Sequence, residues 1–166
     1  GVQGLVLSQD FFNIFVFLEI LSIATYALIA LENKSRSLSA GFKYMMAGGI
    51  ASVLYLLGSA FVYGTGGGLH LGVVQQAPDL FISGSGYVAL FLMLAGIIIE
   101  LKPFPANGWA LDVYESAHPA VSGLMSAAGT GAVLFVLYKL LAILPAPMVP
   151  VEIGRASCRE RVYTKV

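Results

Sequence analysis

Four long apolar stretches separated by polar links dominate the pattern along the chain. They run from about Phe11 to Leu31, Ala40 to Tyr63, Tyr87 to Leu101 and Ala120 to Leu144. A helix needs about 20 apolar residues to cross the hydrocarbon core of a bilayer, and each stretch is near that length, the third being short. The sequence shows neither the alternation typical of strands nor an internal repeat. The pattern therefore predicts an all-α integral membrane bundle of about four transmembrane helices.

The polar links predict how this bundle is oriented in the membrane. The first link, Glu32–Ser37, contains Lys34 and Arg36, whereas the long link Gly64–Gly86 contains neither lysine nor arginine. Loops rich in lysine and arginine stay on the cytoplasmic side. We therefore expect the first link to be cytoplasmic, the second to be external, and the first helix to run from outside to inside.

Composition supports a membrane protein and excludes a soluble enzyme. The chain is 58% hydrophobic and only 11% charged, whereas about a quarter of the residues in soluble domains are charged. We expect the lipid bilayer to surround the chain, and we expect no nucleic-acid partner. There is neither an initiator methionine nor a basic region before an apolar stretch, so the sequence predicts an internal fragment without a signal peptide.

The C-terminal tail has a different composition from everything before it. The segment "EIGRASCRERV", residues Glu152–Val162, is polar and basic. Read back into codons, it matches a common short-read sequencing adapter, and the alternative is a soluble tail. We expect residues 1–151 to be native and residues 152–166 to be an artefact. This division also removes Cys158, the only cysteine, and with it disulfides, zinc–thiolate sites and cysteine nucleophiles.

The first apolar stretch carries a carboxylate well inside it. Glu19 is short and distant from both ends of "FFNIFVFLEILSIATYALIAL". An ionisable group there is costly and by default indicates an ion or proton path. Lys139, close to the end of the fourth stretch, is expected to reach the interface with its long stem, and the same structural interpretation fits Lys43, near the cytoplasmic start of the second.

The third stretch ends in charges and prolines. In "IIIELKPFPANGW", Glu100 and Lys102 stand beside Pro103 and Pro105. Proline breaks a helix, and broken helices inside membranes line polar cavities in ion-coupled transporters. The alternative is that Pro103 only ends the span at the interface. The residues alone support the two interpretations equally.

The region after the prolines holds further polar and aromatic residues. Asp112, Glu115 and His118 are too sparse and too widely spaced to predict a metal site. Trp109 and Tyr114 fit interfacial anchors. No metal and no cofactor is therefore expected.

Small residues also recur at four-residue spacing in two of the stretches. They are Gly48 and Ser52 in the second stretch, and Gly123, Ala127 and Gly131 in the fourth. Small residues at this spacing allow helix backbones to approach closely in lipid. We therefore expect the second and fourth helices to lie inside a bundle.

Several segments together resemble one known family. "DFFNIFVFLEILSIATYALIAL", "GFKYMMAGGIASVLYLLGSAFVYGTGG" and "PFPANGWALDVYESAHPAVSGLMSA" resemble successive helices of the antiporter-like, proton-conducting subunits of respiratory complex I. These NADH-quinone oxidoreductase subunits of N, M or L type are related to subunits of multisubunit sodium/proton antiporters and of membrane-bound hydrogenases. The resemblance implies a proton-translocating membrane subunit, of which the chain covers about helices five to eight. It implies that Glu19 is the essential glutamate of the fifth helix and that Lys43 is a lysine of the sixth, and that the two form a charge pair in a proton-conducting subunit.

Three positions depart from the family pattern. Counting back from Pro105 and Trp109, the lysine of the seventh helix falls on Glu100, and Lys102 lies two residues on, roughly 200° around a helix. The histidine of the family's Pro-x-His-x-Trp segment falls on Asn107, and the lysine of the eighth helix falls on Gly131.

These departures imply a shortened or rerouted proton relay. Lys102 replaces the lost seventh-helix lysine if the helix is unwound there. Glu115 and His118 are secondary candidates for the positions that are missing.

Three functions remain open at this point. The first is proton translocation, through Glu19, Lys43, Glu100 and Lys102, by a non-redox subunit of a complex I-like or related redox-driven complex. The second is a subunit of a multisubunit sodium/proton antiporter, and the third is a non-conducting structural subunit. No motif for NAD, flavin or an iron–sulfur cluster is present. The expected partners are other membrane subunits and protons, or alternatively sodium ions, in a bacterial or archaeal inner membrane.

Overall fold

The computed structural model describes residues 1–31, 34–104 and 107–144. The tail 152–166, which the sequence assigns to a sequencing artefact, lies outside the described residues, as does Pro105.

Four helical segments are long and apolar enough to cross a membrane. They are α2 (Phe11–Ala30), α3 (Ser35–Gly66), α5 (Gly84–Leu101) and the segment Pro119–Ile143. The last segment consists of α7 (Pro119–Leu124), a π-helical turn η2 (Met125–Gly129) and α8 (Thr130–Ile143). The described residues contain no strand, only an isolated bridge between Asp10 and His70. The prediction of an all-α bundle with about four transmembrane helices is confirmed.

Short helices complete the described part of the chain. They are α1 (Val2–Leu7), α4 (Leu71–Gln75), the 3-10 turn η1 (Pro78–Ile82) and α6 (Gly108–Ser116).

Side-chain caps define where two of the spans begin. The Asp10 carboxylate accepts from the backbone N–H groups of Phe12 and Asn13 at the start of α2. The Ser83 hydroxyl accepts from the backbone N–H of Gly86 at the start of α5. Such caps satisfy amide groups that a helix start leaves unpaired.

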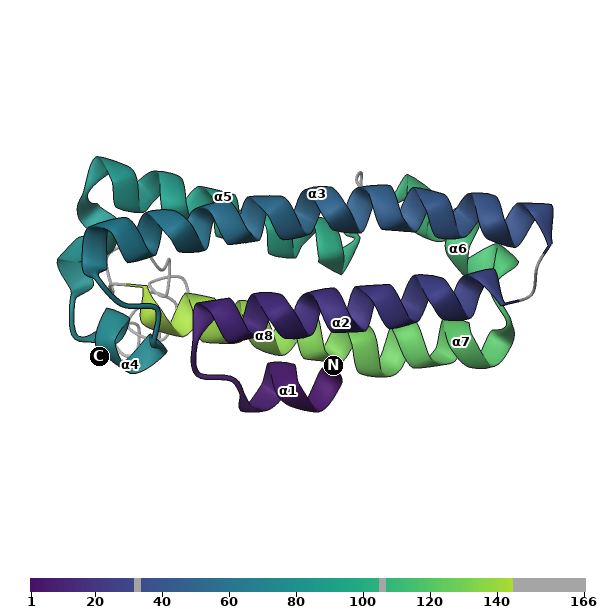
Figure 1. Cartoon of the computed structure of the whole chain (residues 1–166), viewed down its shortest axis with the longest axis horizontal. Coiled ribbons are helices and arrows are strands. Elements are labelled where there is room, and N and C mark those ends of the chain that lie inside the picture. Colours follow the sequence, from purple (N-terminus) through teal and green to yellow (C-terminus); the bar gives the residue numbers. More distant parts are fainter. Residues whose placement is uncertain (32–33, 105–106, 145–166) are drawn as a thin grey trace, which may run out of the picture.

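The central helix of the bundle is α3, which packs against α2, α5 and α6. With 32 residues it is about 48 Å long, well above the roughly 30 Å of bilayer hydrocarbon. Figure 1 shows the end of α2 and the start of α3 at the same end as α6 and α7, and α4 at the opposite end. The two links used to predict orientation thus lie at opposite ends of the bundle. Which end faces the cytoplasm stays a prediction.

Glycines bring α3 and α5 into close contact. A Cβ atom at Gly96 would lie 2.5 Å from the Ala51 carbonyl oxygen, and one at Gly58 would lie 2.7 Å from the Ala89 carbonyl oxygen. No larger residue fits at either position without moving a backbone. The sequence pattern had instead singled out Gly48, which is buried in α3.

The small residues of the fourth span behave differently from those of α3. Gly123, Ala127 and Gly131 are all exposed. A Cβ atom at Gly123 or Gly131 would meet no atom of another element within 4 Å in the described part of the chain. The close helix contact expected there is not found among the described residues.

The outer surface of the bundle is largely apolar, as expected for a lipid-facing surface. Many large hydrophobic side chains are more than half exposed, for example Phe42, Val53, Phe91, Leu111 and Tyr138. The interior holds two clusters of buried hydrophobic residues, a large one joining α1, α2, α3, α5 and α8, and a smaller one around Tyr44 and Val113.

The third span ends inside the bundle. Glu100, in its last turn, lies beside Gly48 of α3 and Ser22 of α2. Ser22 is eight residues before the end of α2, which corresponds to about 12 Å along the helix. The chain then continues past a break as α6, which packs on the first turns of the same α3. Of the two interpretations left open, the structure therefore favours a helix broken within the membrane over a span that ends at its interface.

Candidate functional site

A buried carboxylate lies at the break. Glu100 is 6% exposed, and the Ser22 hydroxyl donates to its Oε1 across 3.1 Å. A Cβ atom at Gly48 would be in ordinary van der Waals contact with the same oxygen, at 3.5 Å. A buried charge is costly unless it is paired and hydrogen-bonded. Residues of α2 and α3 therefore contact the Glu100 carboxylate on two sides, through the Ser22 hydroxyl and at Gly48.

Lys102 turns back toward Glu100 because the helix ends between them. Pro103 disfavours helical geometry for the residue before it, and Lys102 adopts a left-handed conformation with φ 58° and ψ 42°. Its backbone N–H donates to the Ile99 carbonyl at 3.2 Å. For a residue with a side chain this conformation costs about 1–2 kcal/mol. The sequence allowed Lys102 to replace the lost seventh-helix lysine only if the helix is unwound there. The structure shows that the helix ends at Leu101, just before Lys102.

Glu100 and Lys102 line one small cavity of about 20 Å³. A volume of this size holds about one water molecule. The remaining lining residues come from α2, α3 and the fourth span: Leu21, Thr25, Tyr44, Met125, Gly129 and Val133.

The π-helical turn of the fourth span contributes to this cavity. Met125 and Gly129 are the first and last residues of η2, and both line the cavity. The Thr130 hydroxyl donates to the Met125 carbonyl at 3.2 Å, five residues back. Such π-helical turns inside α-helices frequently occur at functional sites.

Three aromatic rings form a wall beside Lys102. Its Nζ lies 5.9 Å from the centroid of the Trp109 ring. Trp109 stacks on Tyr44 with centroids 5.2 Å apart, and Tyr44 meets Tyr26 edge-on at 6.2 Å. Trp109 and Tyr114, expected as interfacial anchors, both pack against the smaller buried cluster. Trp109 thus also makes a contact with Lys102 that an anchor at the interface would not.

Glu19 lies near this site without being part of the cavity. It is half-buried and precedes Ser22 by three residues on α2, so both side chains project from the same helix face. It is close enough for its charge to act on Glu100. Glu19 therefore lies one helical turn before the serine that donates to Glu100.

Lys43 does not pair with Glu19 in the structure. Its ammonium instead forms an ion pair with the carboxylate of Asp112 on α6, so the expected Glu19–Lys43 pair is not found. The reason is the broken third span, which places α6 against the first turns of α3, the part of that helix that carries Lys43. The hydrogen bond and the charge of Lys43 hold the pKa of Asp112 below its ordinary value.

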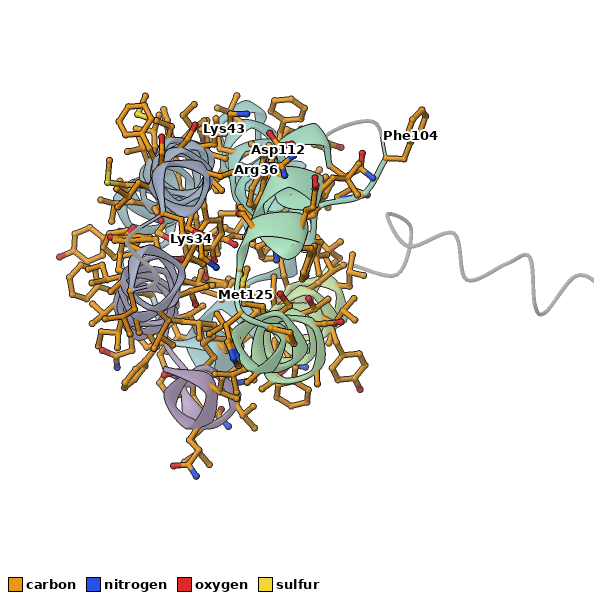
Figure 2. The ribbon with its side chains drawn as sticks, turned by 90° about the vertical axis from the view of Figure 1, so that its right-hand side faces the viewer. Lys34, Arg36, Lys43, Phe104, Asp112 and Met125 are labelled. Carbon is orange, nitrogen blue, oxygen red and sulfur yellow. The ribbon has the colours of Figure 1, made fainter. Side chains whose placement is uncertain are left out.

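Two further contacts fasten α6 to the start of α3. Arg36 pairs with Glu115 at 3.0 Å, and the Ser37 hydroxyl donates to the Ser116 carbonyl at 3.0 Å. Figure 2 shows Arg36, Lys43 and Asp112 gathered between the two helices, whereas Phe104 points away from the bundle. Arg36, Lys43 and Asp112 also line a surface pocket of about 150 Å³.

The secondary candidates Glu115 and His118 lie outside the cavity. Glu115 is exposed and paired with Arg36, as described above. His118 caps α7, where its Nδ1 accepts from the backbone N–H of Ala120 at 3.3 Å. In the described ranges no group of histidine and carboxylate side chains is arranged to hold a metal ion.

Lys139 makes contacts that the sequence did not predict. Its ammonium donates to the carbonyl oxygens of Leu5, Val6 and Ser8, at 3.1, 2.6 and 2.6 Å. These carbonyls belong to the end of α1, where a helix leaves oxygens unpaired. Lys139 therefore acts as a structural cap that joins α8 to α1, and its place at the interface stays a prediction.

Sequence reasoning missed several residues of the site. Ser22 could have been found, because it lies one helical turn after Glu19 on the same face. Thr25 and Tyr44 carried no distinct signal in two apolar helices. Asp112 is separated from Lys43 by 69 residues, and only the position of α6 brings the two together.

A family model matches most of the chain. The model describes the transmembrane region of NADH:quinone oxidoreductase and Mrp antiporter proteins, and it matches residues 8–151.

Curated relatives include NADH-quinone oxidoreductase subunits N from two bacteria. The chain is 36% identical over 142 residues to that of Desulforudis audaxviator, which covers 85% of this chain and 28% of the relative. It is 34% identical over 145 residues to that of a Paenibacillus species, again 85% of this chain and 28% of the relative.

Solved structures of three membrane complexes contain similar chains. An archaeal membrane-bound sulfane sulfur reductase gives a TM-score of 0.79 at 34% identity, over 85% of this chain and 29% of that one. The Mrp complex of a Dietzia species gives 0.76 at 27% identity, over 85% and 27%. Respiratory complex I of Thermus thermophilus gives 0.73 at 29% identity, over 83% and 31%. The chain thus spans less than a third of each of these proteins.

Proposed function

The chain belongs to the family of NADH:quinone oxidoreductase and Mrp antiporter transmembrane proteins, and on that premise we propose that it is part of a subunit that translocates protons. The subunit works within a complex I-like or related redox-driven complex and holds no redox centre of its own in this region. Electron transfer in other subunits supplies the energy.

One observation carries this proposal: Glu100 and Lys102 share a water-sized cavity at a helix break within the membrane. A carboxyl group away from water keeps its proton when no cation is near and releases it when one approaches. A small movement of the Lys102 ammonium therefore suffices to load or unload a proton. No cofactor is needed for this step.

The proposed relay begins at Glu19 and continues to Glu100 and Lys102. Ser22 donates to Glu100 and follows Glu19 by one helical turn, and a hydroxyl can accept one hydrogen bond while it donates another. Lys43, paired with Asp112, holds α6 and marks the polar surface at that end of the bundle.

The secondary candidates take supporting positions in this proposal. Glu115 and His118 lie at the ends of α6 and α7, where protons can reach them from outside the bundle. Because neither lies in the cavity, we assign them to the approach instead of the relay itself.

The surroundings follow from the same family. The similar solved chains belong to complexes of several membrane subunits, and other membrane subunits are therefore its partners. We propose protons as the translocated ion and a bacterial or archaeal inner membrane as its location.

A Glu19→Gln substitution in the complete subunit, within its complex, tests the proposal. We expect proton transport in proteoliposomes to be lost while the complex still assembles, because the amide cannot carry a proton. Glu100→Gln should give the same result. Unchanged transport in both variants, with assembly intact, would leave a non-conducting structural subunit as the better description.

The likeness to an Mrp chain, at a TM-score of 0.76, supports a second candidate, a sodium/proton antiporter subunit. The two candidates differ in the source of energy. Proton uptake driven by an electron donor supports the redox-driven complex, whereas uptake driven by an imposed sodium gradient alone supports the antiporter.

A further inference from the structure

We propose that Trp109 is a positioning residue for Lys102: its ring holds the lysine ammonium at the cavity, facing Glu100. This inference rests on the proposed function, because it concerns how the relay in this chain is kept in place. Lys102 follows the last residue of α5 and is no longer part of a helix.

The chain around Lys102 does little to orient its side chain. Helix α5 ends at Leu101, and Lys102 is followed by Pro103 and Phe104, which are both exposed. Phe104 is 87% exposed and points away from the bundle (Figure 2). A lysine side chain has a flexible four-carbon stem. Local backbone geometry therefore turns Lys102 toward the cavity but does not hold its ammonium there.

Trp109 supplies the missing contact from a different element. The ammonium lies 5.9 Å from the ring centroid, within the range in which a cation is attracted to an aromatic face. Tryptophan is the most effective partner in such contacts, and the attraction is strongest away from water. Lys102 is half-buried, so Glu100 and Trp109 share a cation that water only partly surrounds.

The ring itself is firmly placed. Trp109 stacks on Tyr44 with an interplanar angle of 24°, and Tyr44 is only 4% exposed. Tyr26 supports Tyr44 from the other side. The stacking of the three rings therefore fixes the face of Trp109 that the Lys102 ammonium contacts.

The position of Trp109 also depends on contacts distant from the cavity. Trp109 is in the first turn of α6, and that helix is fastened to α3 by the pairs Lys43–Asp112 and Arg36–Glu115. A shift of α6 would carry the ring away from Lys102. The ion pairs at the surface and the relay in the interior are thus joined through one aromatic side chain.

Proton transport by the complete subunit within its complex, reconstituted in proteoliposomes, tests this inference. We expect Trp109→Leu to slow transport about tenfold, as for the loss of a cation–π contact in a site with little water. Trp109→Phe keeps an aromatic face and should restore a substantial part of the rate. Leucine and phenylalanine are of similar bulk. If Trp109 served only for packing, the two variants would therefore transport protons at similar rates.

A double-mutant cycle separates positioning from general packing. Because Lys102→Met is itself expected to abolish transport, the cycle is measured by the midpoint of thermal unfolding of the complex. Trp109→Leu should lower this midpoint less in the Lys102→Met background than in the native subunit, because interacting residues are not additive. An equal decrease of the midpoint with and without the Lys102 ammonium would overturn the inference. So would full transport by Trp109→Leu in the otherwise native subunit. If Trp109→Leu does not assemble, the same cycle with Trp109→Phe decides in the same way.

The transport rates of the single variants show which of the two proposals fails. Unchanged transport in Lys102→Met and Glu100→Gln would contradict the relay, and with it the proposed function. Loss of transport in those two variants, together with full transport in Trp109→Leu, would contradict only the role of Trp109.

Discussion

The Ser22 hydroxyl on α2 donates a hydrogen bond to the buried Glu100 carboxylate on α5, at 3.1 Å and across 78 residues of sequence. This contact joins two membrane-spanning helices through polar groups that have little access to water. Glu19 precedes Ser22 by three residues on the same face of α2. The serine that donates to Glu100 is therefore one helical turn from the other acidic residue of the proposed relay.

Removal of this hydroxyl should weaken both the fold and proton transport. Ser22→Ala leaves one Glu100 oxygen without its described partner, which costs about 1–3 kcal/mol for a hydrogen bond to a charged group. We expect a lower midpoint of thermal unfolding and slower proton transport in proteoliposomes. Ser22→Thr keeps the hydroxyl and should be close to the native protein in both measurements.

An exposed serine provides the matched control for that substitution. Ser126 is exposed on the fourth span, so Ser126→Ala should change neither property. If the two alanine substitutions had equal effects, the Ser22–Glu100 hydrogen bond would contribute nothing specific to stability or to proton transport.

The Lys43–Asp112 pair should make the attachment of α6 depend on pH. Lys43 lowers the pKa of Asp112 in the folded protein, so the unfolded state binds protons more readily. The stabilisation is therefore fully present at neutral pH and is lost as the pH falls below about 3.9, the ordinary value for aspartate, and through the lower folded value. Hydrogen exchange of the amides in Gly108–Ser116 measures this attachment.

Comparison with Lys43→Met at each pH removes the direct effect of pH on exchange. At neutral pH we expect faster exchange in the variant than in the native protein, and at acidic pH the difference should vanish. Asp112→Asn should match Lys43→Met, and the double variant should add nothing. A difference between native and variant protein that persists unchanged into acid would contradict a role for this pair.

Much of the architecture could be predicted from the sequence, because the signals were local. Runs of apolar residues marked the four spans, and the charges beside Pro103 marked a break in the third. Glu100 and Lys102 were singled out for the same reason, because a proline inside a helix removes a backbone donor and breaks it. The sequence did not decide whether this break lies inside the bundle, because that depends on how α5 packs along α3.

The partners of the charged residues could not be predicted in the same way. The family resemblance implied that Lys43 pairs with Glu19, but the broken helix brings Asp112 to Lys43 instead. Lys139 caps α1, a helix at the other end of the sequence, and no sequence pattern indicated this contact. In each case the partner is set by the packing of elements that are distant along the chain.

Lys139 should stabilise α1 through the three carbonyl oxygens that it contacts. Lys139→Met removes all three hydrogen bonds and leaves carbonyls at the end of α1 without a described side-chain partner, at a cost of about 1–3 kcal/mol. We expect faster exchange of the Leu5 and Ser8 amides, which are bonded within that helix. Lys139→Arg keeps donors at the same place and should restore most of the protection. Equal protection in the methionine variant would assign the stability of α1 to its packing on α8 alone.

The left-handed conformation of Lys102 predicts that stability and transport respond in opposite directions to one substitution. Glycine adopts φ near 58° without the clash that a Cβ atom causes, so Lys102→Gly should relieve about 1–2 kcal/mol of strain. The same change removes the ammonium beside Glu100 and should abolish proton transport. Lys102→Met is the matched control, because it loses the ammonium but keeps the strained backbone. We therefore expect both variants to lose transport, and only the glycine variant to show a higher midpoint of thermal unfolding. A glycine variant that still transports protons would show that the relay bypasses Lys102. A glycine variant that unfolds at a lower temperature than the methionine variant would show that the turn is not strained.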